Sequence, residues 1–237
     1  VQRSGTALAA ALARLGVRRI NVAHALHFED RLVDLLAVWG LPYDLTLTDY
    51  YLAADHPHLI GTAGPSCRRD PRPALVDGAE RLIACSADLA TGLSAFWPDL
   101  TVIPAGPVDG FDSGQPVPVP LAPGEPMRVL LGSALPHKGR DTILRVAALG
   151  TQQGAPLAFH VVTEKKVTDP GGTHLAQHVT PLLRTSEKIA DVVETVHPHL
   201  FWMPFEAPET YSFIASDAIA HRLPILATAV GAIPERL

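Results

Sequence analysis

The sequence predicts an α/β protein of two units, each with a parallel β-sheet and crossover helices. Short runs of β-forming residues alternate with longer amphipathic stretches, which is the order typical of parallel sheets. A Pro/Gly-rich stretch interrupts this alternation near the middle of the chain. The 237 residues are 47% hydrophobic, so the chain can bury a substantial core, and its length suits one large or two small domains.

The first half shows strand-like runs separated by stretches of helical period. Leu8, Leu12 and Leu15 recur at helical spacing in the first of these stretches. Ser86 directly follows a strand-like run and can cap the helix after it by accepting a hydrogen bond from a free amide. The strands are predicted at 19–23, 45–48, 82–85 and 101–103, and the helices at 8–15, 32–39 and 89–96.

A linker is predicted at 107–126, because this stretch is dominated by Pro, Gly and Asp and can neither pair as a central strand nor continue a helix. It separates an N-terminal domain, 1–106, from a C-terminal domain, 127–237. Regular alternation resumes after it. The second half has predicted strands at 128–131, 157–162, 200–203 and 225–227, and predicted helices at 141–149, 187–196 and 211–222.

Composition excludes several classes of protein. A formal charge of -5 and a pI near 6.1 argue against a nucleic-acid binder. Two cysteines outside any Cys-x-x-Cys pair favour a reducing cytoplasm, and no apolar run is long enough for a transmembrane helix. We therefore expect a cytoplasmic protein, with peripheral attachment to the inner membrane as an open alternative. The missing initiator Met and the helix-like last residues predict a partial chain, with an incomplete N-terminal domain and a truncated C-terminus.

The loop 132–139, directly after a predicted strand, is the first candidate binding element. Ligands of open parallel sheets bind beyond the carboxyl ends of the strands. Lys138, followed by Gly139, places a cation where the backbone can approach closely, an arrangement suited to a pyrophosphate. The alternative is a solvated surface lysine.

The segment 208–217 is the second candidate. If its helix begins near Tyr211, the amides of Tyr211, Ser212 and Phe213 are free to bind an anion. Glu209 and Asp217 would then stand about 12 Å apart along the helix axis, about the span from the sugar to the ribose of a nucleotide-sugar. The alternative is a capping Glu and an exposed helical Asp.

Four strings carry a specific resemblance and occur in family order. The chain contains YDLTLTDYYLAAD, CSADLATGLSAFWPDLTVIPAG, RVLLGSALPHKGRDTIL and PETYSFIASDAIAHRLPILATAVGAIPERL. Together they resemble retaining glycosyltransferases of the GT-B architecture, of the glycosyl transferases group 1 type. This resemblance implies two Rossmann-like domains, with the nucleotide-sugar donor bound by the C-terminal one.

The resemblance also implies roles for individual residues. Glu209 would contact the sugar hydroxyls, Lys138 the donor phosphates, and Asp217 the ribose diol. Backbone amides of 210–213 would bind the distal phosphate, and the base would lie at a loop near 179–183. The implied catalytic residues are Glu209 and Lys138; the donor-binding set is Ser133, Lys138, Glu209, Thr210, Tyr211, Ser212, Phe213, Asp217 and Leu183; the acceptor side has His27 and Asp49.

The expected activity is transfer of a sugar from a UDP- or GDP-linked donor to a glycan, lipid-linked or protein acceptor, as in polysaccharide biosynthesis. Neither a metal nor a cofactor is expected, and the pairs His56/His58 and His197/His199 lack ligand partners at a suitable spacing. Thr48 and Asp217 replace the family's usual His and second Glu. These departures keep a second hypothesis open, a non-catalytic binding or scaffold domain; a sugar-phosphate isomerase of similar architecture is a third.

Overall fold

The computed structural model describes residues 2–26, 28–61, 64–65, 67–106, 114–163, 179–183 and 189–237. The chain folds into two compact units. The first comprises Val1–Val108 and Pro208–Tyr211, and the second comprises Asp109–Ala207 and Ser212–Leu237. Each unit contains a parallel β-sheet, and helices lie on described connections between its strands, so the predicted α/β class is confirmed.

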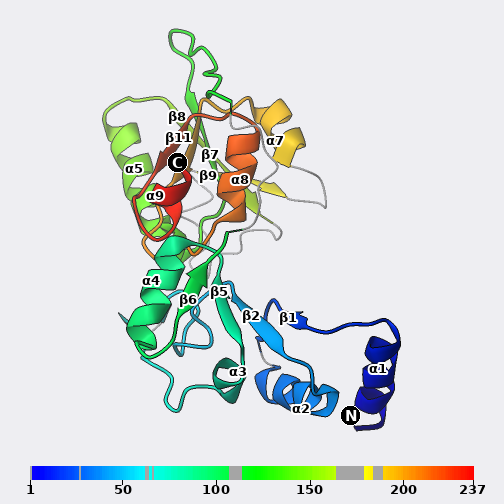
Figure 1. The fold of residues 1–237 in the computed structure, drawn as a ribbon. Helices are drawn as coiled ribbons and strands as arrows, with labels where there is room; N and C mark the ends of the chain where they lie inside the picture. Colours follow the sequence, from blue (N-terminus) through cyan, green and yellow to red (C-terminus); the bar gives the residue numbers. More distant parts are fainter. Residues whose placement is uncertain are drawn as a thin grey trace. The chain divides into compact units, whose positions relative to one another are not determined.

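The first unit is built on a four-stranded parallel sheet of order β1-β2-β5-β6 (Figure 1). The strands are β1 (Ile20–Val22), β2 (Tyr43–Leu47), β5 (Arg81–Ala84) and β6 (Val102–Pro104), and the helices are α1 (Gln2–Arg14), α2 (Glu29–Trp39), α3 (Ala74–Asp77) and α4 (Ala87–Phe96). A short antiparallel pair, β3 (Ile60–Gly61) and β4 (Gly64–Pro65), follows β2. In the core of the first unit, Leu45, Leu89 and Trp97 are almost fully buried.

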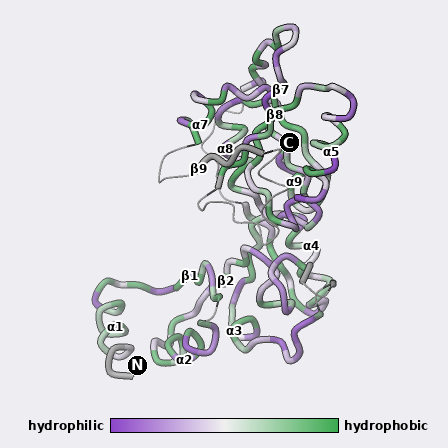
Figure 2. The backbone as a smooth tube through the Cα atoms, turned by 180° about the vertical axis from the view of Figure 1, so that it is seen from behind, coloured by the Kyte–Doolittle hydropathy of each residue, from purple (hydrophilic) through white to green (hydrophobic). Residues whose placement is uncertain are grey.

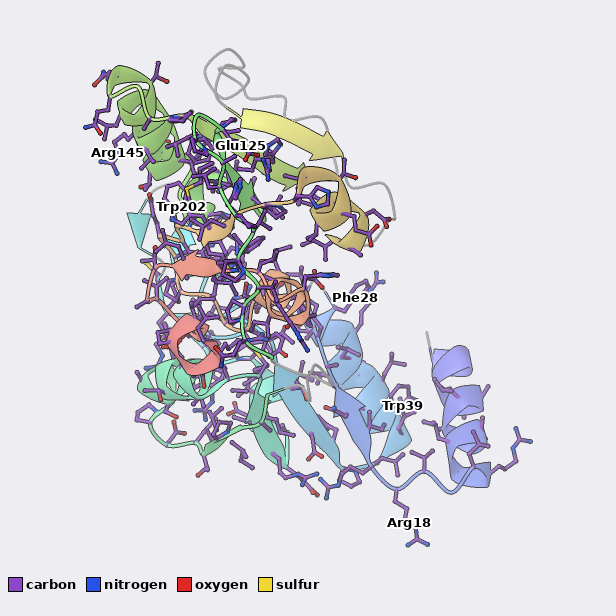
Figure 3. The ribbon with its side chains drawn as sticks, turned by 90° about the horizontal axis from the view of Figure 1, so that it is seen from above. Arg18, Phe28, Trp39, Glu125, Arg145 and Trp202 are labelled. Atoms are coloured by element: carbon purple, nitrogen blue, oxygen red, sulfur yellow. The ribbon has the colours of Figure 1, made fainter. Side chains whose placement is uncertain are left out.

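Two hydrogen bonds stabilise helices of the first unit. Ser86 Oγ accepts a hydrogen bond from the amide of Leu89 at 3.1 Å, which confirms the predicted cap of α4. Trp39, labelled in Figure 3, donates its indole N–H to the carbonyl of Gly5 at 3.2 Å, which joins α2 to α1. A partly buried indole still needs an acceptor for its N–H, and the Gly5 carbonyl supplies it.

The second unit has a five-stranded parallel sheet of order β11-β10-β7-β8-β9. The strands are β7 (Met127–Leu131), β8 (Leu157–Thr163), β9 (Val179–Leu183), β10 (Leu200–Met203) and β11 (Ile225–Ala227). The helical segments are η1 (Pro136–Lys138), α5 (Arg140–Gln152), α7 (Ile189–Val196), α8 (Phe213–Ala220) and α9 (Ile233–Arg236).

Alternate residues of β7 enter two different cores. Leu130 packs with residues of α7 and α8, whereas Val129 and Leu131 pack with residues of α5. Side chains of a strand point alternately to opposite faces, so a strand buried on both faces is apolar at successive positions. This is why 129–131 form a continuous aliphatic run. Figure 2 colours the backbone of the chain by hydropathy and labels β7.

The structure corrects two sequence predictions. Residues 179–183, expected as a loop, form strand β9 at the edge of the sheet, paired with β8. Pro181 has no N–H to donate, and an edge strand tolerates this loss. Helix α8, expected from Tyr211, begins at Phe213. The other predicted strands agree with the structure to within two residues at either end. Within the expected linker, 114–126 contains no helix or strand, and 107–113 lies outside the described residues.

Candidate functional site

The Lys138 loop connects β7 to α5 at the carboxyl edge of the second unit's sheet. Gly139 has a φ of 84°, and a Cβ at this position would overlap the carbonyl oxygen of Pro204. Only glycine combines this backbone conformation with so close an approach. Ser133 lies earlier in the loop and accepts a hydrogen bond from the amide of Leu135 at 3.4 Å.

This loop packs against the loop that follows β10. The carbonyl of His137 accepts hydrogen bonds from the amides of Glu206 and Ala207, at 3.2 and 3.3 Å. The ammonium of Lys138 lies 4.5 Å from the ring centroid of Phe205, within the range of a cation–π interaction. The structure therefore brings Lys138 to the loop that leads into Glu209 and α8, two elements that the sequence treats separately.

The short segment Pro208–Tyr211 belongs to the first unit by its contacts. Thr210 Oγ1 donates to the carbonyl of Thr48 at 2.6 Å, and Cys85 Sγ donates to the carbonyl of Thr210 at 3.3 Å. Glu209 is 9% exposed, and Tyr211 is buried in the first unit's core. The side chain and the carbonyl of Thr210 are therefore both held by the first unit. The sequence instead predicted that this segment is the start of a helix.

Helix α8 begins after Ser212, whose backbone is left-handed with φ 68° and ψ 84°. A non-glycine residue in this conformation interrupts the helical path, which explains why Tyr211 stays outside the helix. Glu209 is therefore not helical, and the expected separation of Glu209 and Asp217 along one helix axis is wrong. Phe213 is exposed, while Asp217 is partly buried on α8.

Arg236, at the end of α9, reaches the start of α8. It donates from Nη1 to the carbonyl of Ser212 at 3.3 Å and from Nη2 to Ser216 Oγ at 2.7 Å. Sequence reasoning missed Arg236, because the stretch that separates it from Ser216 includes β11 and a loop. The sequence indicated Arg236 only by its position, because it comes shortly after the loop with Gly231 that follows β11.

Asp49, which the resemblance assigns to the acceptor side, lies in a narrow pocket with His24 and Thr48. His24 Nδ1 lies 3.1 Å from Thr48 Oγ1, and Asp49 Oδ1 accepts the amide of Tyr51 at 2.8 Å. His27, the histidine favoured by sequence, lies outside the described residues. His24 was missed, although it follows β1 just as Thr48 follows β2, and neighbouring parallel strands end at the same edge.

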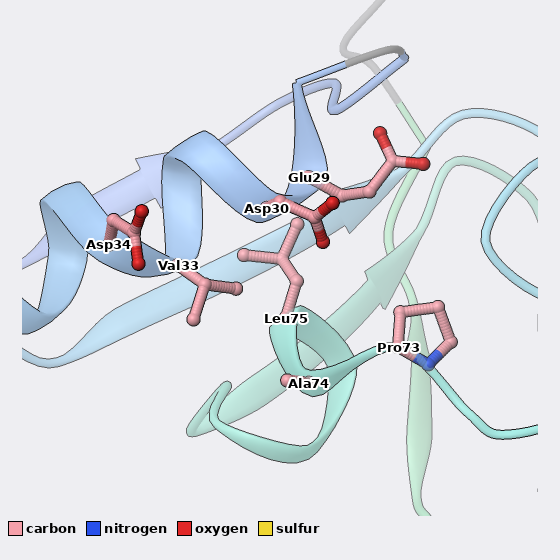
Figure 4. Close-up of a pocket in the computed structure, with 7 residues that line it drawn as sticks. All are labelled: Glu29, Asp30, Val33, Asp34, Pro73, Ala74 and Leu75. Atoms are coloured by element: carbon pink, nitrogen blue, oxygen red, sulfur yellow. The ribbon is translucent and has the colours of Figure 1, made fainter.

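A larger pocket of about 210 Å³ lies between α2 and α3 of the first unit (Figure 4). Ligand pockets commonly span about 300–1,000 Å³, so this pocket is too small for a whole nucleotide-sugar. Two of its acidic residues, Glu29 and Asp30, lie in the first turn of α2, where carboxylates complement the helix dipole. The pocket is lined by Glu29, Asp30, Val33, Asp34, Pro73, Ala74 and Leu75.

Glu29 is held within the first unit. Its Oε1 accepts hydrogen bonds from the Tyr51 hydroxyl at 2.7 Å and from Arg69 Nη1 at 3.2 Å. Burial by itself would raise the pKa of Glu29, but these hydrogen bonds outweigh it, so the pKa lies below its ordinary value. A carboxylate kept ionised in this way fits a structural ion pair between α2 and the Arg69 loop.

Neither a metal centre nor a membrane span is found in the part of the chain that the structure describes. No cluster of three or more His, Cys, Asp or Glu side chains in these ranges could hold a metal ion. The ring centroids of His56 and His58 lie 5.6 Å apart. Among the described helices, none has both the length and the hydropathy to cross a membrane.

No protein-family model matches the sequence, and no curated protein matches it. Solved structures do. The Anabaena protein HepE, in complex with UDP and glucose, is similar with a TM-score of 0.63 at 16% identity over 96% of this chain and 64% of HepE. The pneumococcal O-GlcNAc transferase GtfA, in complex with UDP and GlcNAc, has a TM-score of 0.64 at 10% identity over 94% of this chain and 44% of GtfA.

A third similar structure is the lipopolysaccharide outer core galactosyltransferase WaaB, with a TM-score of 0.56 at 11% identity over 99% of this chain and 63% of WaaB. The chain thus spans less than two thirds of the length of each of these three proteins. At these identities the similarity establishes the fold.

Proposed function

We propose that this chain is part of a retaining glycosyltransferase of the GT-B architecture that uses a UDP- or GDP-linked sugar. One observation carries the proposal: the Lys138 loop packs against the loop that leads into Glu209 and α8. These elements follow β7 and β10, which are neighbours in the sheet, so both lie at its carboxyl edge. That the similar HepE and GtfA structures contain UDP supports the same ligand class.

In this proposal the second unit binds the donor diphosphate. The charge of Lys138 and the positive end of the α8 helix dipole stabilise the negative charge that develops as the nucleoside diphosphate leaves. One such preorganised donor is worth about 3 kcal/mol at a transition state. Asp217 binds the ribose diol, Ser133 lies beside the phosphates, and the base lies near Leu183 on β9.

The sugar and the acceptor complete the reaction. Glu209 holds hydroxyls of the transferred sugar through its buried carboxylate. The leaving phosphate takes the proton of the acceptor hydroxyl, so the mechanism needs neither a dedicated base nor a metal. Asp49 lies on the acceptor side, and we add His24 to it because it shares a pocket with Asp49 and Thr48. The acceptor class is a glycan, a glycolipid or a glycoconjugate.

Calorimetric titration of the full-length protein with UDP, GDP and ADP tests this function. We expect saturable binding of UDP or GDP, and a Kd of micromolar order would correspond to about 8 kcal/mol of binding free energy. The absence of saturable binding for every nucleoside diphosphate would reject the proposal.

The second candidate is a non-catalytic domain that binds the nucleotide-sugar without transferring it. It is favoured by Thr48, whose carbonyl accepts the Thr210 hydroxyl and whose side chain faces His24, where the family usually has a His. A coupled assay that detects released UDP separates the two. Donor hydrolysis or transfer that disappears in Glu209→Ala would exclude the non-catalytic domain, whereas binding without turnover would favour it.

A further inference from the structure

The segment 114–124, which precedes β7, is apolar although most of it is exposed. It contains no charged residue, and all of 115–118 and 120–124 is exposed. Val117 and Leu121 are 61% and 51% exposed. In Figure 1 the segment belongs to the green stretch that leads into β7. Contiguous exposed apolar surface is typical of interaction sites.

The backbone of 115–120 is restricted to extended conformations. Each of these residues either is Pro or directly precedes Pro. The Pro ring fixes φ near about −65°, and the residue before Pro is confined to the β and polyproline II regions. Successive residues restricted in this way favour a polyproline II helix, with about three residues per turn and a rise of about 3.1 Å per residue. We call 115–121 the proline ridge.

Contacts at both ends hold the proline ridge on the second unit. The amide of Val117 donates to the carbonyl of Arg222 at 2.8 Å. A Cβ at Gly114 would lie 2.6 Å from Cζ of Arg222, so the guanidinium packs closely on the backbone before the ridge. After the ridge, the amide of Glu125 donates to the carbonyl of Ala122 at 3.0 Å and closes a turn. A ridge ordered in this way loses little conformational entropy when a partner binds it.

We propose that the proline ridge is a docking site for a partner protein with an aromatic-lined groove, of the kind that recognises polyproline II ligands. Pro118 and Leu121 lie one turn apart on one edge of the ridge, about 9 Å along its axis, which is the spacing of the two prolines in a PxxP ligand. Because Pro has no N–H, the ridge offers mainly carbonyl acceptors, and the Trp and Tyr side chains of such grooves can donate to them. The absence of charge in 114–124 favours an aromatic partner surface over a charged one. The inference does not depend on the proposed function.

Two purified domains with such grooves, an SH3 domain and a WW domain, are the probes. Each domain is isotope-labelled and titrated with the full-length protein, and NMR follows the indole N–H of the Trp in its groove. We expect a saturable shift for at least one domain. Leu121→Asp should weaken this binding about tenfold or more, because it removes a Leu side chain that the groove would bury. Pro118→Ala should weaken it several-fold, because it also releases the backbone of Val117.

The matched control is Leu149→Asp. Leu149 lies on α5 in the same unit and is also 51% exposed, so this variant should bind both probes as the unaltered protein does. Leu121→Asp should keep the Tm and the UDP affinity of the unaltered protein, because the ridge takes no part in the proposed donor site. Equal losses in the two Asp variants, or no shift of either probe, would overturn the inference.

Sedimentation equilibrium tests the other occupant of the ridge, a second copy of this chain. We expect the unaltered protein and Leu121→Asp to have the same mass in solution. If the unaltered protein self-associates and Leu121→Asp does not, the ridge is a contact between copies, and the inference of a partner with an aromatic groove is wrong.

Discussion

Substitutions of Lys138 and of Phe205, whose ring lies 4.5 Å from the Lys138 ammonium, test the proposed phosphate contact. We expect Lys138→Ala to weaken UDP binding about 10- to 100-fold, since a hydrogen bond to a charged group is worth about 1.5–3 kcal/mol. Phe205→Leu keeps an apolar core residue but removes the ring 4.5 Å from the ammonium, so its effect should be only a few-fold. Calorimetry of UDP binding measures both effects.

The matched control is Arg145→Ala. Arg145 is an exposed cation on α5 in the same unit, on the outer side of that helix in Figure 3. Its loss changes the net charge as Lys138→Ala does, but it should leave the UDP affinity within a factor of two. Equal losses in the two variants would mean that Lys138 acts only through long-range charge.

Gly139 tests whether the close approach of two loops positions Lys138. Gly139→Ala places a Cβ against the Pro204 carbonyl in a backbone with φ 84°, so we expect a loss of about 2–4 kcal/mol of unfolding free energy. Gly124→Ala is the control, because its φ is 80° but its Cβ would meet nothing within 4 Å. That variant carries the strain alone and should lose about 1 kcal/mol. Urea unfolding curves of the two variants compare the losses, and equal values would contradict the packing of Gly139 on Pro204.

At the scale of elements, the junction of β7 and β10 should be sensitive to acid. His199 precedes β10, is buried, and accepts the amide of Arg128 through Nδ1 at 2.9 Å. Burial, together with the Arg128 charge, lowers the pKa of His199 below the ordinary value of 6.5. The pKa of His199 is lower in the folded protein than in the unfolded chain. The stability that neutral His199 contributes is therefore complete above pH 6.5, and it is lost as the pH falls through the pKa of the folded protein.

The Tm measured between about pH 8 and pH 5 checks this expectation. His199→Asn keeps a short acceptor but cannot be protonated, so its Tm should fall less steeply below pH 6.5 than that of the unaltered protein. His24→Asn is the control, because His24 is exposed and lies in the other unit. Parallel curves for the unaltered protein and His199→Asn would contradict a role for His199 in the acid response.

The sequence predicts an element well when the contacts that fix its ends lie within a few residues of it. Ser86 caps α4 through the amide three residues ahead, and such a contact is visible as a pattern. Strand β9 contains Pro181, which argues against a strand until its edge position in the sheet is known. The start of α8 depends on Ser212, whose conformation is held by Arg236 at a distance of 24 residues. No local pattern contains that contact.

The same distinction holds for the candidate site. Lys138 stood out because Gly139 follows it, but the overlap that requires Gly139 involves Pro204, sixty-five residues later. His24 lies beside Thr48 because β1 and β2 are parallel neighbours, and this pairing became available only with the sheet order. Residue types could therefore be chosen from the sequence, whereas their partners required the fold.

For the whole molecule, the proposal assigns the donor diphosphate to the second unit alone. UDP at about 100 times its Kd should stabilise the unit that binds it by about 2.7 kcal/mol, which slows exchange through unfolding about 100-fold. Hydrogen exchange followed by mass spectrometry should show this protection in peptides from β7, η1 and α8. Peptides from β1 and β2 of the first unit should exchange as they do without ligand, because UDP carries no sugar for Glu209 to bind. Protection confined to β1 and β2 would place the nucleotide in the first unit and contradict the assignment of Lys138 and α8 to the donor.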